Sequence, residues 1–325
     1  MVSSKLKLDD VMDLVVNAIE SIKISGTPAE LYEPIDYILS LGGKRLRPAL
    51  VCLSCDMFGG DLPSSLHAAK GIEVFHNFSL VHDDIMDNAY LRRGKMTIHE
   101  KWNNNVAILS GDAMLIKAYD FVLQGNYQNL NQILTIFNRA AIEVCEGQQL
   151  DMNYETQAEV SVGEYINMIK LKTSVLLGAA LKIGALIGEA SDENAELVYD
   201  FGVNMGVGFQ LMDDYLDAFG DPEKFGKKVG GDIISNKKTF LFIKALELDK
   251  DGVVDSWLSK EIFDEVEKVE AIKGVYINTG VDQLCIAEMN KYYDTALLKL
   301  DQITVDNSSK KALRDFSEYI RKRVR

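Results

Sequence analysis

Apolar residues recur at helical spacing along almost the whole chain, as in LDDVMDLVVNAIESI, LNQILTIFNRAAIEV and SVLLGAALKIGALIG. Sustained alternation of apolar and polar residues, which marks half-buried strands, is absent, and only five prolines interrupt the 325 residues. No repeat and no low-complexity linker divides the chain. The pattern therefore predicts an all-α protein, a single large helical bundle domain over residues 1–325 with ten or more helices.

Charge and cysteine usage narrow the class of protein. The chain carries 49 acidic against 35 basic residues, a formal net charge of −14, which argues against a nucleic-acid or anionic-membrane surface. It shows no apolar secretory segment and no run of about 18 apolar residues that predicts a membrane span. The lone C-x-x-C of Cys52 and Cys55 favours buried structural cysteines over a zinc or redox site. We expect a reduced, cytoplasmic protein without integral membrane association.

Three aspartates interrupt an apolar helical segment, FHNFSLVHDDIMDNAYLRRG, at residues 75–94. At 100° per residue, Asp83, Asp84 and Asp87 share one arc of about 100°, and His76 projects into the same arc. A solvated acidic face is the alternative interpretation. Such a face would normally mix Lys, Glu and Asn over a broad surface, whereas this arc is narrow and carries carboxylates between bulky apolar neighbours.

The same pattern recurs in GFQLMDDYLDAFG, where Asp213, Asp214 and Asp217 line one face and Gln210 stands a turn earlier. Buried carboxylates in such number would repel one another and rise in pKa unless cations neutralised them. Mg²⁺ is usually held by a few carboxylates plus water and substrate phosphates. The two motifs together therefore predict a cavity lined by magnesium-binding carboxylates.

Basic residues supply the donors that phosphate binding needs. They occur in four segments: Lys44, Arg45 and Arg47 in LGGKRLRP, Arg92 and Arg93 in LRRG, Lys172 beside Thr173 in KLKTS, and Lys227 and Lys237 in the Gly- and Lys-rich residues 220–238. Taken alone, each reads as a surface base, and residues 220–238 read as a solvated loop. Together they suggest two anion sites, one bridged by metal to the carboxylates and one made of basic residues only.

The chain resembles the trans-isoprenyl diphosphate synthases of the polyprenyl synthetase family. The segments that carry the resemblance follow the family's order from residue 42 to 240, and the C-terminal YIRKR also fits: GGKRLRP, EVFHNFSLVHDDIMD, LRRG, AILSGD, GQQLD, KLKTS, GFQLMDDYLD, GDPEKFGKKVGGD and KKTF. The resemblance implies the isoprenoid synthase fold, with helices around a central active-site cavity. The family often has Pro where Met96 stands and Gly where Asn103 stands, which affects only local loop geometry.

The resemblance also implies roles for single residues. Mg²⁺ would be bound by Asp83, Asp84, Asp87, Asp213 and Asp217, with Asp214 assisting. An allylic diphosphate would be bound by Arg92, Lys172, Lys227 and Lys237, and isopentenyl diphosphate by Gly43, Lys44, Arg47, His76 and Arg93. Thr173 and Gln210 would present oxygens near the developing carbocation. The resemblance further implies three Mg²⁺ ions per active site, with Mn²⁺ able to substitute, and a homodimer.

The implied reaction joins isopentenyl diphosphate head-to-tail to dimethylallyl, geranyl or farnesyl diphosphate and releases diphosphate. The released diphosphate takes the proton, so no protein base is required, and His82 and His99 are expected to be structural. Two alternatives remain. A class I terpene cyclase would lack the second D-D-x-x-D and the Lys44/Arg47 site, and a non-catalytic subunit of a heteromeric prenyl synthase would have lost one acidic motif.

Residues that precede the first acidic motif determine the expected product length. Phe78 and Phe75 lie five and eight residues before Asp83, roughly 7–12 Å along a helix, and Ser79 leaves space between them and the carboxylates. In the family an aromatic residue at the position of Phe78 restricts products to short chains. We therefore expect farnesyl to geranylgeranyl diphosphate, with geranylgeranyl favoured. The alternative is that both phenylalanines are ordinary core residues that face away from the tunnel.

Overall fold

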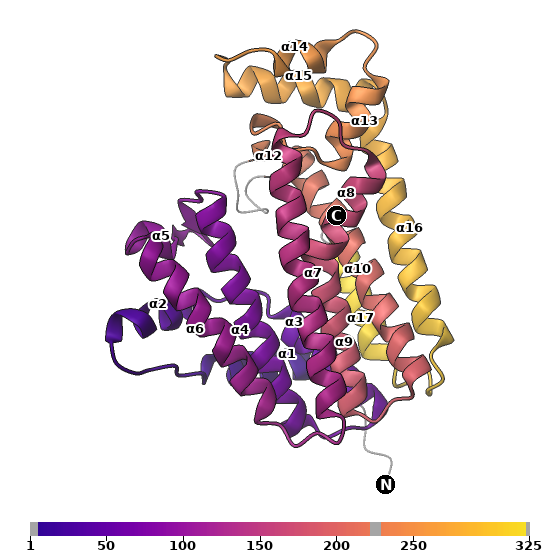
Figure 1. Ribbon diagram of the computed structural model, residues 1–325. Coiled ribbons are helices and arrows are strands. Elements are labelled where there is room, and N and C mark those ends of the chain that lie inside the picture. Colours follow the sequence, from indigo (N-terminus) through magenta and orange to yellow (C-terminus); the bar gives the residue numbers. More distant parts are fainter. Residues whose placement is uncertain (1–5, 222–228, 323–325) are drawn as a thin grey trace. The chain divides into compact units, whose positions relative to one another are not determined.

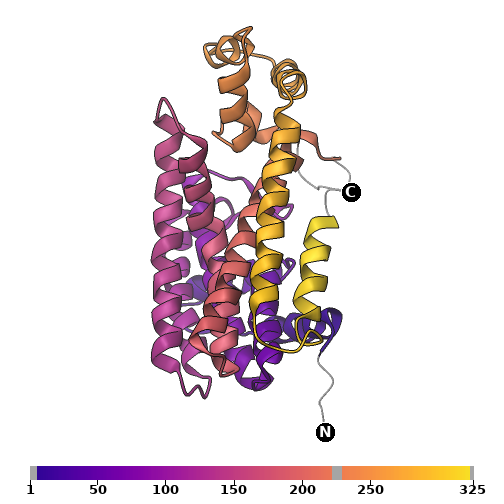
Figure 2. The same ribbon diagram turned by 90° about the vertical axis from the view of Figure 1, so that its right-hand side faces the viewer.

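The computed structural model describes residues 6–221 and 229–322, which form helices almost throughout (Figures 1 and 2). Within these ranges the only strands are β1 (Leu91–Arg92) and β2 (Lys95–Met96), which pair as an antiparallel ribbon. The prediction of an all-α fold with ten or more helices is confirmed. Among the described helices, none has both the length and the apolar character needed to cross a bilayer.

The chain divides into two compact units, each assembled from three separate segments. Unit 1 comprises the residues up to 139, residues 179–199 and residues 303–315. Unit 2 comprises residues 140–178, residues 200–302 and the residues from 316 onward. Because neither unit is one continuous stretch, no linker in the sequence marks a boundary. The single domain over residues 1–325 stays a prediction.

Unit 1 is organised around the long helix α4. Its complete elements, besides β1 and β2, are α1 (Leu8–Glu20), α2 (Ala29–Ser40), α3 (Leu46–Phe58), α4 (Leu62–Met86), α5 (Ile98–Lys101) and α6 (Asn104–Leu123). Asp61 begins α4 by accepting the backbone N–H of Ser64 at 2.9 Å, a standard N-cap. Helix α4 packs along α6 and against α3 (Figure 1), and buries Ile72, Phe75 and Val81.

Unit 2 contains the helices that carry the second acidic motif and its neighbours. Its complete elements are α8 (Val162–Ile169), the π-helical turn η1 (Lys170–Ser174), α12 (Gly231–Ile234), α13 (Phe240–Leu248), α14 (Val253–Leu258), α15 (Glu265–Asn278) and α16 (Val281–Gln302). Four helices contribute residues to both units: α7 (Leu130–Thr156), α9 (Val175–Ile187), α10 (Asp192–Phe219) and α17 (Lys311–Arg321).

The cysteines behave as structural residues. Cys52, Cys55 and Cys285 are buried thiols outside any disulfide, and Cys145 is exposed. Burial raises the pKa of Cys52 to about 11 and the pKa of Cys55 to about 12, so both thiols are protonated at neutral pH. The interpretation of the C-x-x-C as buried structural cysteines is confirmed.

A buried ion pair anchors the loop that precedes α3. Gly42, Gly43 and Arg45 have positive φ angles of 76°, 133° and 47°. Arg45 donates one N–H to the carboxylate of Glu73 on α4 and another to the carbonyl of Leu39 at 2.7 Å. The side chains of Arg45 and Glu73 are both buried. The pair therefore attaches the loop to α4, and Arg45, one of the donors in LGGKRLRP, serves the fold.

Replacing Arg45 with alanine is expected to lower the free energy of unfolding by about 3–5 kcal/mol, because Glu73 would remain as a buried charge without its partner. Urea denaturation followed by circular dichroism measures the change. The double variant Arg45→Met/Glu73→Leu removes both charges and should recover most of the loss. Lys117→Ala breaks an exposed pair with Asp120 and should cost less than about 1 kcal/mol. Equal costs for the two alanine variants would contradict the assignment.

Candidate active site

The aspartates of the first motif lie at the C-terminal end of α4 and differ in exposure. Asp87 is exposed and Asp83 is half-buried, whereas Asp84 is 1% exposed. Arg92 donates from Nε to Oδ1 of Asp84 at 3.0 Å and from a second N–H to the same oxygen. Burial raises the pKa of Asp84, and the ion pair with Arg92 only partly offsets this effect. Asp84, predicted to bind Mg²⁺, and Arg92, predicted to bind the allylic diphosphate, are therefore bound to each other.

A short hairpin carries both arginines of LRRG. Leu91 pairs with Met96 and Arg92 with Lys95 in this antiparallel ribbon. Arg93 and Gly94 have φ angles of 54° and 74°, and two successive positive φ values are what a type I′ hairpin turn requires. The turn directs Arg93 back to the loop before α3, where it donates to the carbonyl of Gly42.

A basic cluster in unit 1 brings together four of the residues predicted to bind isopentenyl diphosphate: Gly43, Arg47, His76 and Arg93. A Cβ atom at Gly43 would lie 2.8 Å from the guanidinium carbon of Arg93, so glycine permits this approach. Nη1 of Arg47 lies 3.2 Å from Nε2 of His76. Because arginine only donates, Nε2 accepts, and the proton of the neutral ring is on Nδ1. Burial and the charges of Arg47 and Arg93 hold the pKa of His76 well below its usual range. Lys44, which follows Gly43 in the sequence, is exposed.

In unit 2 the second motif shows the same division of exposure. Asp213 and Asp217 on α10 are half-buried, and Asp214 is buried. Tyr165 donates its hydroxyl to one oxygen of Asp214, and Nε2 of Gln210 donates to the other at 3.0 Å. Burial raises the pKa of Asp214 to about 7. In both motifs the second aspartate is thus buried and hydrogen-bonded, while the first and last are more exposed.

Residues 220–238 contain a helical turn where the sequence analysis expected only a loop. The turn is α12, and Oδ2 of Asp217 accepts the backbone N–H of Asp232 at its start, at 2.9 Å. The carbonyl of Asp217 also accepts the N–H of Gly230 at 2.6 Å. A carboxylate at a helix N-terminus is favourable, which explains why so short a helix forms. Lys227 lies outside the described residues.

Two lysines predicted to bind the allylic diphosphate meet at one carboxylate. Nζ of Lys172 donates to Oδ2 of Asp151 at 2.6 Å, and Nζ of Lys237 lies 3.7 Å from the same oxygen. Burial raises the pKa of Asp151, but the charges of Lys237 and Lys172 outweigh it and leave the pKa below its ordinary value. Asp151 is therefore ionised and acts as the shared counter-ion of both lysines.

A small polar cavity adjoins these lysines. Thr173 lies in the π-helical turn η1, and its hydroxyl donates to Oε1 of Gln210 at 3.1 Å. Turns of this kind are common at functional sites. Together with Asp151, Lys172, Lys237 and Asp214, these two residues line a cavity of about 40 Å³. The structure thus brings together Lys172, Thr173, Gln210, Asp214 and Lys237 of the predicted site in unit 2.

Sequence reasoning missed residues that hold this cluster in place. Asp151 belongs to GQQLD, a segment that matched the family without any role, and that match was the available signal. Lys268 on α15 is 1% exposed, and its Nζ donates to the carbonyl of Ile234 at 3.0 Å and to Oδ1 of Asn236 at 2.6 Å. These contacts fix the segment before Lys237. Nothing in EVEKVEAIKG distinguishes Lys268 from a surface lysine.

The carboxylates of the two acidic motifs suit a hard cation that also binds water and substrate oxygens. In the described ranges 6–221 and 229–322, no three His, Cys, Asp or Glu side chains gather closely enough to hold a metal ion by themselves. Mg²⁺ often takes only one or two carboxylates and completes its shell with water and substrate phosphate oxygens. The more exposed pairs Asp83/Asp87 and Asp213/Asp217 fit that requirement.

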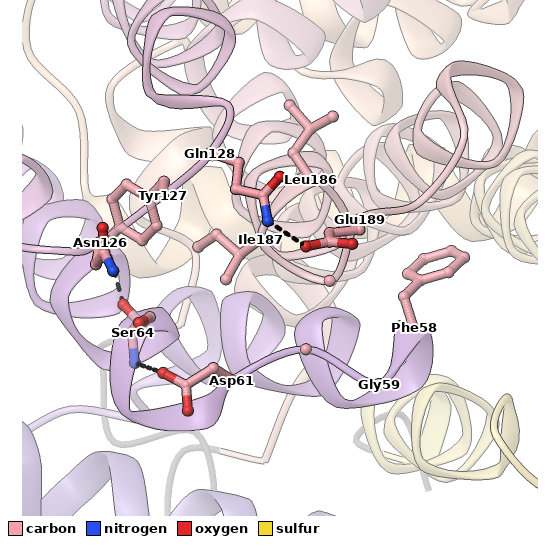
Figure 3. Close-up of a pocket in the computed structure, with 12 residues that line it drawn as sticks. Phe58, Gly59, Asp61, Ser64, Asn126, Tyr127, Gln128, Leu186, Ile187 and Glu189 are labelled. Atoms are coloured by element: carbon pink, nitrogen blue, oxygen red, sulfur yellow. Dashed lines mark hydrogen bonds between the residues drawn. The ribbon is translucent and has the colours of Figure 1, made fainter.

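A larger cavity, of about 340 Å³, lies at the opposite end of α4 in unit 1 (Figure 3). It is bounded by helix ends and turns, where Tyr127 donates to the carbonyl of Ser64 at 3.1 Å and Gln128 to Glu189 at 2.9 Å. Asp61, which caps α4, lines it, and Asp83 follows about 33 Å further along the helix. None of the predicted site residues lines this cavity.

Comparison with known proteins identifies the family. The family model described as polyprenyl synthetase matches residues 28–276. The chain is 37% identical over 330 residues to a geranylgeranyl diphosphate synthase of Sulfolobus acidocaldarius, covering 97% of this chain and 98% of that protein. A crystal structure of a geranylgeranyl pyrophosphate synthase matches at a TM-score of 0.93 with 46% identity, over 97% and 98% of the two chains. The geranylgeranyl pyrophosphate synthase from Corynebacterium glutamicum, solved with isoprenyl diphosphate and magnesium, matches at 0.86 with 26% identity, over 98% and 100%.

These similarities extend over nearly the whole chain and place it among the all-α enzymes that act on isoprenoid diphosphates. It belongs to the polyprenyl synthetase family. Its enzyme class is that of the trans-prenyltransferases that make short-chain prenyl diphosphates from isopentenyl and allylic diphosphates. The predicted family, fold class and enzyme class are confirmed, and the comparisons give no support to a terpene cyclase or a non-catalytic subunit.

Replacing Asp151 with asparagine is expected to lower the free energy of unfolding at pH 7 by roughly 1–3 kcal/mol, with allowance for the half-exposed Lys237. The pKa of Asp151 is depressed in the folded state, so its contribution is fully present above about pH 4, the unfolded pKa, and is lost as the pH falls through the folded pKa. Thermal unfolding from pH 7 to pH 2 should therefore show the two proteins converging in Tm at low pH. Asp120→Asn is the exposed control, and a pH-independent difference would contradict the ion-pair assignment.

Proposed function

We propose that the chain condenses isopentenyl diphosphate with dimethylallyl, geranyl or farnesyl diphosphate to give farnesyl to geranylgeranyl diphosphate, chiefly geranylgeranyl. The observation that carries this proposal is the shared design of the two D-D-x-x-D motifs. In each, the second aspartate is fixed by hydrogen bonds within its own unit, and the first and last aspartates are more exposed. The basic clusters in each unit supply the additional donors that two diphosphates require.

We assign the metal to the acidic motifs. Asp83 and Asp87, and Asp213 and Asp217, would hold Mg²⁺, with the buried second aspartates in supporting positions. Three ions per active site, with Mn²⁺ able to substitute, are proposed from the family resemblance. When bound, the metal supplies positive charge that stabilises the departing diphosphate.

We assign the basic residues to the two substrates. Lys172 and Lys237, with Arg92 and Lys227, would bind the allylic diphosphate, because a lysine ammonium group offers three N–H donors to an anion. Gly43, Lys44, Arg47, His76 and Arg93 would bind isopentenyl diphosphate, and the neutral ring of His76 adds a donor without adding charge. Thr173 and Gln210 would direct oxygens at the carbocation, and their mutual hydrogen bond fixes those oxygens.

Loss of a first aspartate should lower turnover by orders of magnitude and leave the fold intact. Asp83→Ala and Asp213→Ala are each expected to lower kcat/KM by at least about 10²-fold, because charge stabilisation of this kind is worth several kcal/mol. The assay incubates the purified chain with isopentenyl and dimethylallyl diphosphates and Mg²⁺, and mass analysis identifies the products. Asp120→Ala on α6 is the control. Near-normal activity in EDTA would rule out the proposed mechanism, and cyclic hydrocarbon products would indicate a cyclase.

An aromatic stack on α4 supports the assignment of product length. The rings of Phe78 and Phe75 lie 5.5 Å apart, and Phe75 is followed by Phe137 of α7 at 5.4 Å. Phe137 in turn contacts Tyr119 of α6 at 5.0 Å. We propose that Phe78 is the floor of the product cavity, with Ser79 leaving space above it. Phe75, packed against Phe137, which in turn contacts Tyr119, would form a second barrier behind Phe78.

Phe78→Ala is expected to lengthen the main product by one or two five-carbon units, because the vacated volume ends at Phe75. Stability should fall by roughly 3–5 kcal/mol, as is typical for a core phenylalanine. Mass analysis of products at a fixed substrate ratio measures the first effect and urea denaturation the second. Phe316→Ala, at a buried position in unit 2, should destabilise without changing product length. Loss of stability with unchanged products would make Phe78 an ordinary core residue.

We propose a homodimer, which the family resemblance implies and a surface of α6 supports. Leu109, Ile116 and Leu123 follow one another at seven-residue intervals, so they share one face of the helix. They are 59%, 64% and 51% exposed, which leaves an apolar stripe without cover in a single chain. A second copy of the chain would present the same stripe and could bury it by symmetry.

Charge placed on this stripe is expected to separate the dimer. Leu109→Asp/Ile116→Asp would bury carboxylates in the proposed interface, so the variant should be a monomer by light scattering at micromolar concentration where the wild type is a dimer. Lys244→Glu/Glu247→Lys exchanges the charges of an ion pair on α13, outside the stripe, and should leave the dimer intact. A monomeric wild type would contradict the proposal.

The remaining proposals concern the whole molecule. A single domain over residues 1–325 and a cytoplasmic location are proposed from the sequence pattern and the family resemblance. The thiols of Cys52, Cys55 and Cys285, which form no disulfide, are compatible with a reducing compartment.

A further inference from the structure

The ring of His82 lies between α4 and α6, directly against Phe78. The two ring centroids are 4.8 Å apart with an interplanar angle of 66°, an edge-on contact between residues one helical turn apart. Nε2 of His82 lies 3.2 Å from the carbonyl oxygen of Ile108 on α6. Because a carbonyl only accepts, this nitrogen carries the proton and donates. The hydrogen bond fixes the ring on the side of Phe78 opposite to Phe75.

Gly111 provides the space that the His82 ring occupies. A Cβ atom at Gly111 would lie 2.3 Å from Nε2 and 2.6 Å from Cδ2 of His82, closer than real Cβ contacts. The neighbouring Ser110 donates to the carbonyl of Leu31 on α2 at 2.9 Å, which fixes this part of α6. Ser110 and Gly111 belong to AILSGD, a segment that matched the family without any chemical role. The segment thus builds a socket for the histidine ring.

Phe78 is therefore held from two sides by unequal supports. On one side Phe75 is 1% exposed and is backed by Phe137 and Tyr119. On the other side, Phe78 contacts the ring of His82. The hydrogen bond to Ile108 and the space at Gly111 hold this ring in place. Removing His82 would open space beside Phe78 into which its ring can turn.

We propose that His82 is a positioning residue that holds Phe78 across the product cavity and so limits product length. This inference rests on the proposed function, in which Phe78 is the floor. A purely structural role for His82, packing α4 on α6, would affect stability alone. A positioning role changes which products the folded enzyme releases, so product lengths are compared at equal concentrations of folded enzyme.

The test compares the product lengths of His82→Ala, Phe78→Ala and the double variant with wild type, from dimethylallyl and isopentenyl diphosphates at a fixed ratio, by mass spectrometry. His82→Ala is expected to lengthen the main product by at least one five-carbon unit. The double variant should give the same products as Phe78→Ala, because His82 acts only through Phe78. His82→Phe, which restores a ring beside Phe78, should return products toward the wild-type length. His67→Ala, elsewhere on α4, is the matched control and should leave products unchanged.

Each other outcome overturns the inference. If Phe78→Ala lengthens products and His82→Ala does not, the floor stands and the positioning role fails. If the double variant exceeds Phe78→Ala, His82 itself lines the product path. If neither single variant changes the length while elongation continues, the floor assignment fails and the inference fails with it. Absence of prenyl transfer in the wild type would instead refute the proposed function on which both depend.

Discussion

A carboxylate in the interior of a helical protein must be compensated, and this requirement organises much of both units. A buried charge without a partner is among the most costly arrangements in a fold. Arg92 forms an ion pair with Asp84, and Arg45 forms one with Glu73. Asp214 is stabilised by hydrogen bonds, and its pKa is raised. Arg92, Arg45 and Tyr165 each belong to another segment of chain than the carboxylate they bind. The contacts that neutralise a charge therefore also fix the hairpin, the loop before α3, and α8, whose tyrosine binds Asp214.

Within each acidic motif, the second aspartate is buried and the first lies nearer the surface. Adjacent residues on a helix point about 100° apart, so two consecutive aspartates cannot both face the same ligand equally. Asp84 and Asp214 turn inward and are held there, which leaves Asp83 and Asp213 on a helix surface whose orientation is already fixed. A ligand that binds these outer carboxylates then meets side chains on a stiff support. Less free energy is spent on ordering the site at the moment of binding.

Helical spacing was enough to predict the all-α fold, and motif order was enough to propose the residues of the site. Neither shows how those residues divide between support and binding. Arg45 and Arg47 both read as donors, and only the left-handed backbone at Arg45 and its burial against Glu73 show that it serves the loop. The turn α12 was missed because the carboxylate that caps it, on Asp217, lies fifteen residues away in sequence. Asp151 reads as one polar residue of a long helix until the lysines from two other segments are placed beside it.

The same reasoning shows why glycine and charge belong together on α7. A Cβ atom at Gly147 would lie 2.2 Å from the backbone nitrogen of Lys172, so the absence of a side chain lets the π-helical turn approach. Asp151 follows Gly147 by four residues and therefore lies on the same face, one turn along. Lys172 is thus restrained at its backbone by contact with the glycine and at its Nζ by the carboxylate. A lysine fixed at both ends has lost most of its rotamer freedom before any ligand arrives, so it can meet an anion without the entropy cost that a free surface lysine would incur.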